Sequence, residues 1–370
     1  MEEVDRARER VMPPRPGQPI PWFKAPILDG NANYAISTAA GRPMLFLLFG
    51  SATDARARAA LDVMLRHADM FDDQNCCFYG VTVDPQDAAQ KRVVPRIPGI
   101  RYFIDYDRSL SILLGALSHA EPSHYKPHWL VIDRQLRLVG RYRLDEQDRA
   151  FANLRMQIAR AAEDSWAPVL EVPNVLEHGL CDQLVELYHG HGGVDSGFMR
   201  DIDGKTVQII DHGHKRRSDV IIEDPTLRDR LQSRIHDRVN PMIARAFQFE
   251  VTRMERYLVA CYDAESGGHF RPHRDNTTKG TAHRRFAVTI NLNTGEYEGG
   301  GLVFPEFGQR AYVAPKGGAI VFSCSLLHQA LPVTSGQRFA FLPFLYDEAG
   351  AKVRQANNAF LGEGVGAYSM

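Results

Sequence analysis

Three residues in the C-terminal third of the chain have the types and spacing needed to bind one metal ion. His273 and Asp275 stand two positions apart in GGHFRPHRDN, and His328 follows in SLLHQALPV. If the first segment is extended, His273 and Asp275 point to the same face, as adjacent ligands of one metal require. A His-x-Asp pair alone is weak evidence, since a chain with fourteen histidines contains about one by chance.

A basic residue nearby indicates the chemistry of such a site. Arg338 opens RFAFLPFLY, the most apolar strand candidate, where an inward-facing guanidinium must be paired. No acidic residue stands between His328 and Tyr346, so a carboxylate carried by a ligand would satisfy Arg338 through two hydrogen bonds. Two histidines and one aspartate are the facial ligand set of non-haem Fe(II) oxygenases. A keto acid would fill two of the open metal positions and O2 the third.

A hydrolytic zinc site using the same three ligands is the rival interpretation. It needs a general base close to the metal-bound water, and it leaves Arg338 without a partner. The Fe(II) interpretation is therefore favoured.

Short strands must position these residues. Apolar runs separated by Gly, Asn, Asp and Pro predict strands at 253–262, 286–293, 301–304, 310–313, 319–323 and 338–346. Strands of this length and spacing favour a sandwich or barrel. Two helical segments precede them, Glu177–Gly190 and Pro225–Phe247.

The first half of the chain instead alternates strands and helices. The expected elements are a strand at 44–49, a helix at 54–68 capped by Asp54, strands at 76–83 and 101–104, a hairpin of 129–132 with 136–142, and a helix at 146–162. This order predicts a layered α/β domain. Ser165-Trp166-Ala167-Pro168 interrupts the pattern, so we expect two domains, at 1–163 and 168–370.

Composition limits the function further. The 370 residues carry a formal net charge of −1, which argues against nucleic acid or anionic lipid as a partner. No apolar run approaches the roughly 18 residues that span a bilayer, and the charged start MEEVDRARER cannot be the apolar core of a secretory signal. Five cysteines without framework spacing fit a reducing compartment, so we expect a cytoplasmic protein.

Residues from about 168 to 348 resemble the prolyl 4-hydroxylase-type Fe(II)/2-oxoglutarate dioxygenases, whose core is a double-stranded β-helix, or jelly roll. The matching segments are VACYDAESGGHFRPHRDN, FAVTINLN, EYEGGGLVFPEFG and PKGGAIVFSCSLLHQALPVTSGQRFAF. One departure is Gly301, where an acidic residue commonly follows the glycine pair. The resemblance implies that iron is bound by three residues and 2-oxoglutarate is contacted by three more: His273, Asp275 and His328 for iron, and Arg338, Tyr262 and Asn291 for 2-oxoglutarate.

Residues 19–28, 41–50 and 127–133 resemble the thioredoxin/peroxiredoxin fold, a likeness of layout. The resemblance implies a cis peptide bond before Pro127. The redox cysteine is missing, because the strand at 44–49 is followed by Gly-Ser-Ala-Thr-Asp. A hydroxyl cannot replace a thiolate in peroxide or disulfide chemistry, so we expect a redox-inactive scaffold or a docking module. Cys76 and Cys77 begin a strand and are expected to pack as core residues.

Other polar residues are weaker candidates. The cluster His212, His214, Lys215, Arg216 and Arg217 either lines the mouth of the substrate site or forms a solvated loop. His283 is expected at the surface. Arg274, between the two ligands, is expected to face away from the metal.

These observations predict an α+β multidomain enzyme with a thioredoxin-like N-terminal domain and a jelly-roll C-terminal domain with flanking helices. The resemblance implies hydroxylation of an aliphatic C–H bond in a small-molecule, amino-acid or peptidyl substrate, with Fe(II), 2-oxoglutarate, O2 and ascorbate as candidate cofactors. The alternative is a redoxin-like interaction or sensor protein whose oxygenase half binds but does not turn over. In both cases the N-terminal domain is a candidate for protein docking.

Overall fold

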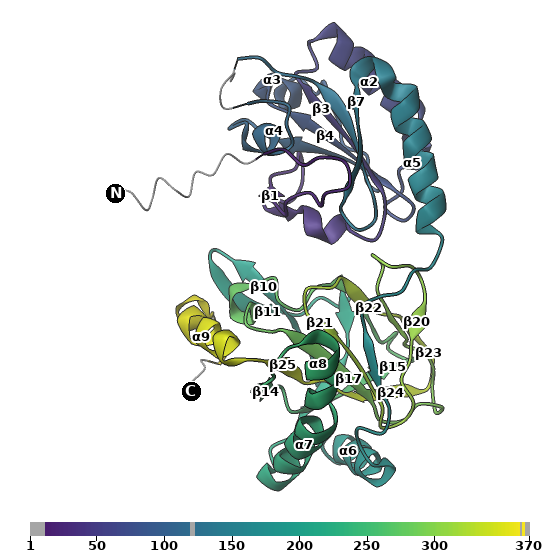
Figure 1. Ribbon diagram of the computed structural model, residues 1–370, viewed down its shortest axis with the longest axis vertical. Coiled ribbons are helices and arrows are strands. Elements are labelled where there is room, and N and C mark those ends of the chain that lie inside the picture. Colours follow the sequence, from purple (N-terminus) through teal and green to yellow (C-terminus); the bar gives the residue numbers. More distant parts are fainter. Residues whose placement is uncertain (1–11, 119–122, 363–364, 367–370) are drawn as a thin grey trace. The chain divides into compact units, whose positions relative to one another are not determined.

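The computed structural model describes residues 12–118, 123–362 and 365–366, so the charged first ten residues lie outside it. The protein divides into two compact units (Figure 1), Met1–Ser165 with Pro305–Gly308, and Trp166–Phe304 with Gln309–Met370. The segment 305–308 thus groups with the first unit, whereas a division along the chain places it in the second. Each unit is described by itself.

A five-stranded sheet in the order β5-β4-β3-β6-β7 forms the centre of the first unit. Its strands are β3 (Met44–Gly50), β4 (Cys77–Thr82), β5 (Ile100–Ile104), β6 (His128–Ile132) and β7 (Leu138–Arg143). The first three are parallel, whereas β6 and β7 are antiparallel to their neighbours. All seven residues of β3 are buried because both faces of the sheet are covered, which explains the continuous apolar run.

The two long helices of the first unit, α2 (Ala55–Arg66) and α5 (Gln147–Ala161), pack on the same hydrophobic cluster as the β3 residues Leu45, Leu47 and Phe49. Both lie on one side of the sheet in Figure 1. The Asp54 cap of α2 is confirmed, since its carboxylate accepts from the amides of Arg56 and Ala57. The smaller elements are β1 (Lys24–Ala25), β2 (Tyr34–Ala35), α3 (Pro85–Ala89), α4 (Ser109–Leu113), η1 (Ile36–Ala39), η2 (Ala68–Met70) and η3 (Leu144–Glu146).

The predicted cis peptide bond before Pro127 is wrong. Among the described residues the cis bond is Ile97–Pro98, so the bond between Lys126 and Pro127 is trans. The entry into β6 is fixed by hydrogen bonds instead. The Lys126 amide donates to the Ala116 carbonyl at 2.8 Å, and the Lys126 carbonyl lies 2.8 Å from His128 Nδ1.

The described part of the second unit contains two large antiparallel sheets and two small two-stranded ones. The larger has the order β14-β25-β17-β24-β15-β13-β9, with β21 pairing both β17 and β8. Its strands are β8 (Leu170–Val172), β9 (Val194–Asp195), β13 (Ser218–Ile221), β14 (Arg253–Glu255), β15 (Leu258–Asp263), β17 (Phe286–Asn291), β21 (Ala319–Ser323), β24 (Gln337–Phe341) and β25 (Phe344–Tyr346). The smaller, β12-β16-β22-β19-β20, contains β12 (Lys215–Arg216), β16 (His269–His273), β22 (His328–Ala330), β19 (Leu302–Val303) and β20 (Ala311–Tyr312).

Three helices cover one face of the larger sheet: α6 (His178–His191), α7 (Pro225–Arg238) and α8 (Asn240–Phe247). Val259 of β15 and Phe339 and Phe341 of β24 belong to the cluster that includes the buried leucines of α6 and α7. Because side chains alternate along a strand, the neighbouring residues Tyr262 and Arg338 point to the opposite, inner face. This alternation places them in the site.

Proline explains two departures from the expected elements. The predicted helix 225–247 is two helices, since Pro241 in the first turn of α8 cannot donate a backbone hydrogen bond. The predicted strand 338–346 is two strands, interrupted at Leu342 and Pro343. The hairpin of β10 (Phe198–Ile202) and β11 (Lys205–Ile209) was not predicted from the sequence.

The remaining elements of the second unit are β18 (Glu298–Gly299), β23 (Val333–Ser335), α9 (Glu348–Ala356), η4 (Lys279–Thr281) and η5 (Asn357–Phe360). Within the described part of the chain, every helix is too short or too polar to cross a bilayer.

Candidate metal centre

Two paired strands of the smaller sheet bring the predicted ligands together. His273, the last residue of β16, lies directly opposite His328, the first residue of β22, in the antiparallel register. Asp275 follows two residues after His273, and its backbone amide donates to the Cys324 carbonyl at 3.0 Å. Backbone pairing alone, without a metal, therefore holds His273 next to His328, which is 55 positions later in the chain.

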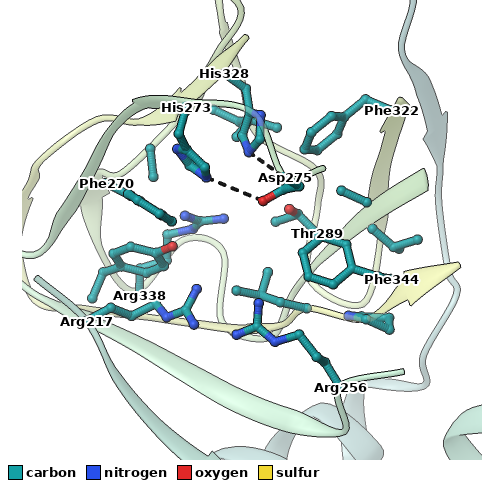
Figure 2. A pocket seen from close by; sticks show the side chains of 17 residues that line it. Arg217, Arg256, Phe270, His273, Asp275, Thr289, Phe322, His328, Arg338 and Phe344 are labelled. Atoms are coloured by element: carbon teal, nitrogen blue, oxygen red, sulfur yellow. Dashed lines mark ion pairs between the residues drawn. The ribbon is translucent and has the colours of Figure 1, made fainter. Parts of the chain in front are cut away.

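The three side chains converge on one point (Figure 2). His273 Nε2 lies 3.5 Å from Asp275 Oδ1, and His328 Nε2 lies 3.3 Å from Asp275 Oδ2. One ligand atom from each residue lies within 4.8 Å of the other two. Two imidazole nitrogens and one carboxylate oxygen form the donor set that suits Fe(II) with open coordination positions.

Backbone carbonyls orient both imidazole rings. His273 Nδ1 lies 2.8 Å from the Arg271 carbonyl, and His328 Nδ1 lies 3.0 Å from the Leu326 carbonyl. A carbonyl can only accept, so each Nδ1 carries the proton and each Nε2 presents its lone pair to the metal position. The site is therefore preorganised for metal binding.

The electrostatics of the ligands agree with this role. Burial, and next the nearby His273, lower the pKa of His328 to about 4, so its ring is neutral at pH 7. Burial alone would raise the pKa of Asp275, but His328 and His273 beside it hold that pKa well below its usual value. A neutral imidazole and an ionised carboxylate are the forms that bind metal.

Arg338 lies on the inner face of β24, opposite Tyr262 of β15 in the register. The Arg338 residue is 3% exposed, and its Nε has no hydrogen-bond partner among the described residues. Its Nη2 donates to Asn291 Oδ1 at 3.1 Å, while Asn291 Nδ2 donates to the Ala314 carbonyl at 2.9 Å. A buried guanidinium with an unsatisfied donor indicates an anionic ligand.

One pocket contains the metal position and Arg338 (Figure 2). The predicted residues His273, Asp275, His328, Arg338 and Tyr262 all line it. The structure places Asn291 behind Arg338, as a residue that orients the guanidinium.

An aromatic wall borders the metal position. The ring of Phe270 stacks on that of His273 with centroids 3.5 Å apart, and Phe322 lies edge-on to His328 at 4.7 Å. These contacts place apolar aromatic surface against both ligand rings.

Sequence reasoning missed two polar residues of the pocket, Thr289 and Arg256, and left a third, Arg217, undecided. Thr289 could have been found, because it precedes Asn291 by two residues on a predicted strand and so shares its face. Arg217 stood in a cluster whose interpretation was left open. Arg256 lies between β14 and β15 with a φ of 69°, a conformation that its sequence does not predict.

The cluster of histidines and basic residues at 212–217 is partly buried and partly exposed. Lys215 and Arg217 are buried, whereas His212 and Arg216 are exposed. The Lys215 ammonium donates to Ser196 Oγ at 2.7 Å and to the Gly197 carbonyl at 2.6 Å. These contacts anchor the segment before β13.

The prediction that His283 lies at the surface is wrong. His283 is 1% exposed and its Nε2 lies 3.1 Å from Glu255 Oε2. The Glu255 carboxylate also pairs with Arg284 through Oε1 and with Arg354 through Oε2. No local pattern predicts this cluster, because Glu255 stands 28 residues before His283. The expectation for Arg274 is confirmed, since its guanidinium turns away from the metal position and donates to the Ser325 carbonyl.

Comparison with known proteins agrees with this geometry. Residues 257–346, which hold all three ligands and Arg338, match the 2OG-Fe(II) oxygenase superfamily. A PKHD-type hydroxylase of Shewanella sp. (strain ANA-3) is 25% identical over 189 residues, covering 48% of this chain and 77% of the relative. A multifunctional procollagen lysine hydroxylase and glycosyltransferase of Rattus norvegicus is 24% identical over 277 residues, which cover 72% of this chain but only 34% of that relative.

Solved structures similar to this chain include a viral collagen prolyl hydroxylase from Paramecium Bursaria Chlorella virus-1, with a TM-score of 0.35, 16% identity and coverage of 48% of this chain and 96% of that one. A Pseudomonas putida prolyl-4-hydroxylase has a TM-score of 0.34 at 15% identity, covering 48% and 92% of the two chains. The superfamily match and the His-Asp-His group identify a 2-oxoglutarate-dependent dioxygenase domain, with Fe(II), 2-oxoglutarate and O2 as its cofactors.

Proposed function

We propose that this protein hydroxylates an aliphatic C–H bond and couples that reaction to the decarboxylation of 2-oxoglutarate to succinate. One observation carries the proposal. The converging nitrogens of His273 and His328 and the Asp275 carboxylate share a pocket with Arg338, whose buried guanidinium has an unsatisfied donor. A dicarboxylate keto acid spans such a pair of sites, with one end on the metal and the other on Arg338.

The protein's own side chains have separate tasks in this reaction. Fe(II) supplies the oxidative chemistry when bound with 2-oxoglutarate and O2. His273, Asp275 and His328 would hold the metal in the pocket that Arg338 also lines. Arg338, oriented by Asn291, binds the distal carboxylate of 2-oxoglutarate, and the Tyr262 ring lies 5.2 Å from the Arg338 guanidinium carbon. The aromatic wall of Phe270 and Phe322 keeps the reacting face dry.

We propose an amino-acid or peptidyl substrate. The names of the relatives, a procollagen lysine hydroxylase and prolyl hydroxylases, support this class. A small-molecule substrate is the alternative. A requirement for ascorbate and a cytoplasmic location stay predictions.

For the first unit we propose a thioredoxin-like domain, 1–163, that has lost redox chemistry and serves as a scaffold or docking module beside the oxygenase domain, 168–370. The strand order and directions support this assignment. At the position of the missing thiol, Ser51 Oγ donates to Asp84 Oδ2 at 2.6 Å, next to the buried Asp87. Burial raises the pKa of Cys76 to about 12, which suits a core residue and not a reactive thiolate.

The function is tested with the purified full chain, Fe(II) and 2-oxoglutarate in air. We expect succinate release above the protein-free rate, and its loss in His273→Ala. His236→Ala, a matched substitution at an exposed histidine of α7, should release succinate at the wild-type rate. Candidate substrates that gain one oxygen atom in air but not under anaerobic conditions would identify the second product.

Absence of 2-oxoglutarate turnover with every candidate substrate would contradict the proposal. If partner proteins then still bound the chain, the interaction or sensor alternative would be favoured.

A further inference from the structure

The pocket is lined by more guanidinium groups than 2-oxoglutarate can pair with. Three guanidinium groups line it, those of Arg338, Arg217 and Arg256, and Asp275 is the one carboxylate among its lining residues. On the function proposed above, Asp275 binds the metal and Arg338 binds the co-substrate. The partners of Arg217 and Arg256 therefore decide what else the pocket accepts.

Arg217 is fully paired inside the protein. Its Nε and Nη2 donate to the two oxygens of Asp219 at 2.7 and 2.6 Å, and Nη2 also donates to Ser196 Oγ at 3.1 Å. Burial would lower the pKa of Arg217, but the carboxylate of Asp219 more than offsets it and raises that pKa. Arg217 therefore needs no ligand.

Arg256 lacks such a partner among the described residues. Its Nη2 is 3.7 Å from Asp219 Oδ2, beyond hydrogen-bond distance, and that oxygen already accepts from Arg217. Burial, and then the like charge of Arg217, lower the pKa of Arg256 to about 10. The Arg256 side chain is 27% exposed, so its charged guanidinium is accessible and has no hydrogen-bonded carboxylate among the described residues.

The position of Arg256 directs this charge into the pocket. Its guanidinium carbon lies 5.3 Å from the centroid of the Phe344 ring, which also lines the pocket. Figure 2 shows its guanidinium pointing into the pocket, across from His273 and His328. Its backbone is left-handed, with a φ of 69°, a conformation that is uncommon for a residue other than glycine.

We propose that Arg256, supported by Arg217, binds a carboxylate of the substrate that is hydroxylated, so that the substrate is an acidic amino acid or a peptide with an acidic residue at the reacting position. This inference rests on the proposed function and narrows its substrate class. A planar fork of N–H donors matches a carboxylate. One uncompensated guanidinium balances the single charge of a carboxylate better than the double charge of a phosphate.

The test is a binding measurement with the full chain, Mn(II) in place of Fe(II), and saturating 2-oxoglutarate. The probes are the N-acetyl methylamides of aspartate and glutamate and their neutral counterparts from asparagine and glutamine, compared by calorimetry at constant ionic strength. We expect at least one acidic probe to bind about tenfold more tightly than its neutral counterpart. Equal affinities, no binding of either acidic probe, or tighter binding of inorganic phosphate would overturn the inference.

Variants locate the effect. Arg256→Gln should abolish the preference for the acidic probe, whereas Arg256→Lys should retain part of it. Arg253→Gln, three residues earlier in an exposed ion pair with Glu348, is the matched control and should behave as wild type. The comparison of acidic and neutral probes on the wild type stands even if Arg256→Gln does not fold.

The affinity for 2-oxoglutarate separates this inference from the proposed function. We expect Arg256→Gln to change the dissociation constant of 2-oxoglutarate less than twofold. A large increase would assign Arg256 to the co-substrate, which overturns the inference and leaves the dioxygenase intact. Failure of the wild type to bind 2-oxoglutarate with Mn(II) would contradict the proposed function itself, and the inference with it.

Discussion

Single buried charges carry most of the specificity of this site. The Arg338 side chain has given up its hydration, yet within the described part of the chain its one hydrogen-bond acceptor is the amide oxygen of Asn291. Such a group is stabilised when a carboxylate arrives, so its removal should affect co-substrate binding far more than folding.

Arg338→Gln is therefore expected to weaken 2-oxoglutarate binding by about 2–4 kcal/mol, roughly 30- to 1000-fold in the dissociation constant. The dissociation constant of Arg338→Lys should lie between those of the wild type and Arg338→Gln, because the ammonium group keeps the charge but lacks the planar fork of donors. Calorimetry with Mn(II)-loaded protein measures both. Arg230→Gln, at an exposed position of α7, is the control, and an unchanged affinity in Arg338→Gln would remove Arg338 from the co-substrate site.

His128 makes the stability of the first unit depend on pH. Burial lowers the pKa of His128 to about 4, below its ordinary value near 6.5. The folded state thus favours the neutral ring. The resulting contribution to the free energy of unfolding is complete above about pH 6.5 and is lost as the pH falls toward 4, a total loss of about 3 kcal/mol.

Urea unfolding at pH 7.5 and pH 5 checks this prediction. The stability lost between the two values should be smaller in His128→Gln than in the wild type, whereas His124→Gln, at an exposed position of the same unit, should match the wild type. The same pH dependence in all three proteins would contradict it.

At the scale of elements, helix α2 depends on the residue that caps its N-terminus. Asp54 accepts hydrogen bonds from the amides of Arg56 at 2.8 Å and Ala57 at 3.1 Å, two donors without a partner within the helix. Asp54→Ala should lower the free energy of unfolding of the first unit by about 1 kcal/mol. Asp62→Ala, on the exposed side of the same helix, should change it little, and equal losses in both variants would argue against the cap.

How much could be predicted from the sequence also differs between elements. The buried strand 44–49 and the helix after it follow from local patterns, and the structure has both as β3 and α2. The short strands β16 and β22 have no such pattern, because they are stabilised by pairing with each other. The ligand triad was nevertheless predictable from residue types, and the structure adds the register that aligns its two histidines.

The contacts of Arg256, Glu255 and His283 could not be predicted in this way. Each depends on a partner distant in sequence or on a backbone conformation at a single residue, and a one-dimensional pattern contains neither. At Pro127 a prediction was made and was wrong. The resemblance of layout implied a cis peptide bond, but the bond is trans and hydrogen bonds of Lys126 fix the entry into β6.

At the scale of the whole molecule, metal binding should be visible as stability. An ion that binds only the folded site stabilises it in proportion to the logarithm of its concentration, about 2.7 kcal/mol at one hundred times the dissociation constant. Adding Mn(II) should therefore raise the melting temperature of the wild type, and EDTA should reverse the change.

His273→Ala should lose this response, whereas Asp54→Ala, which alters only the first unit, should keep it. A response to Mn(II) that persists in His273→Ala would place the ion elsewhere. Differential scanning calorimetry of the full chain measures the unfolding of both units in one experiment.

The strand Leu170–Val172 has a practical consequence for dividing the protein. It hydrogen-bonds along β21, whose other side pairs with β17. A fragment begun after Val172 would leave the backbone groups of β21 exposed along one side and ready to pair with another chain. An oxygenase fragment that remains monomeric should therefore begin before Leu170, and at the other end it should retain Leu361 and Gly362, which bond to Thr206 of β11.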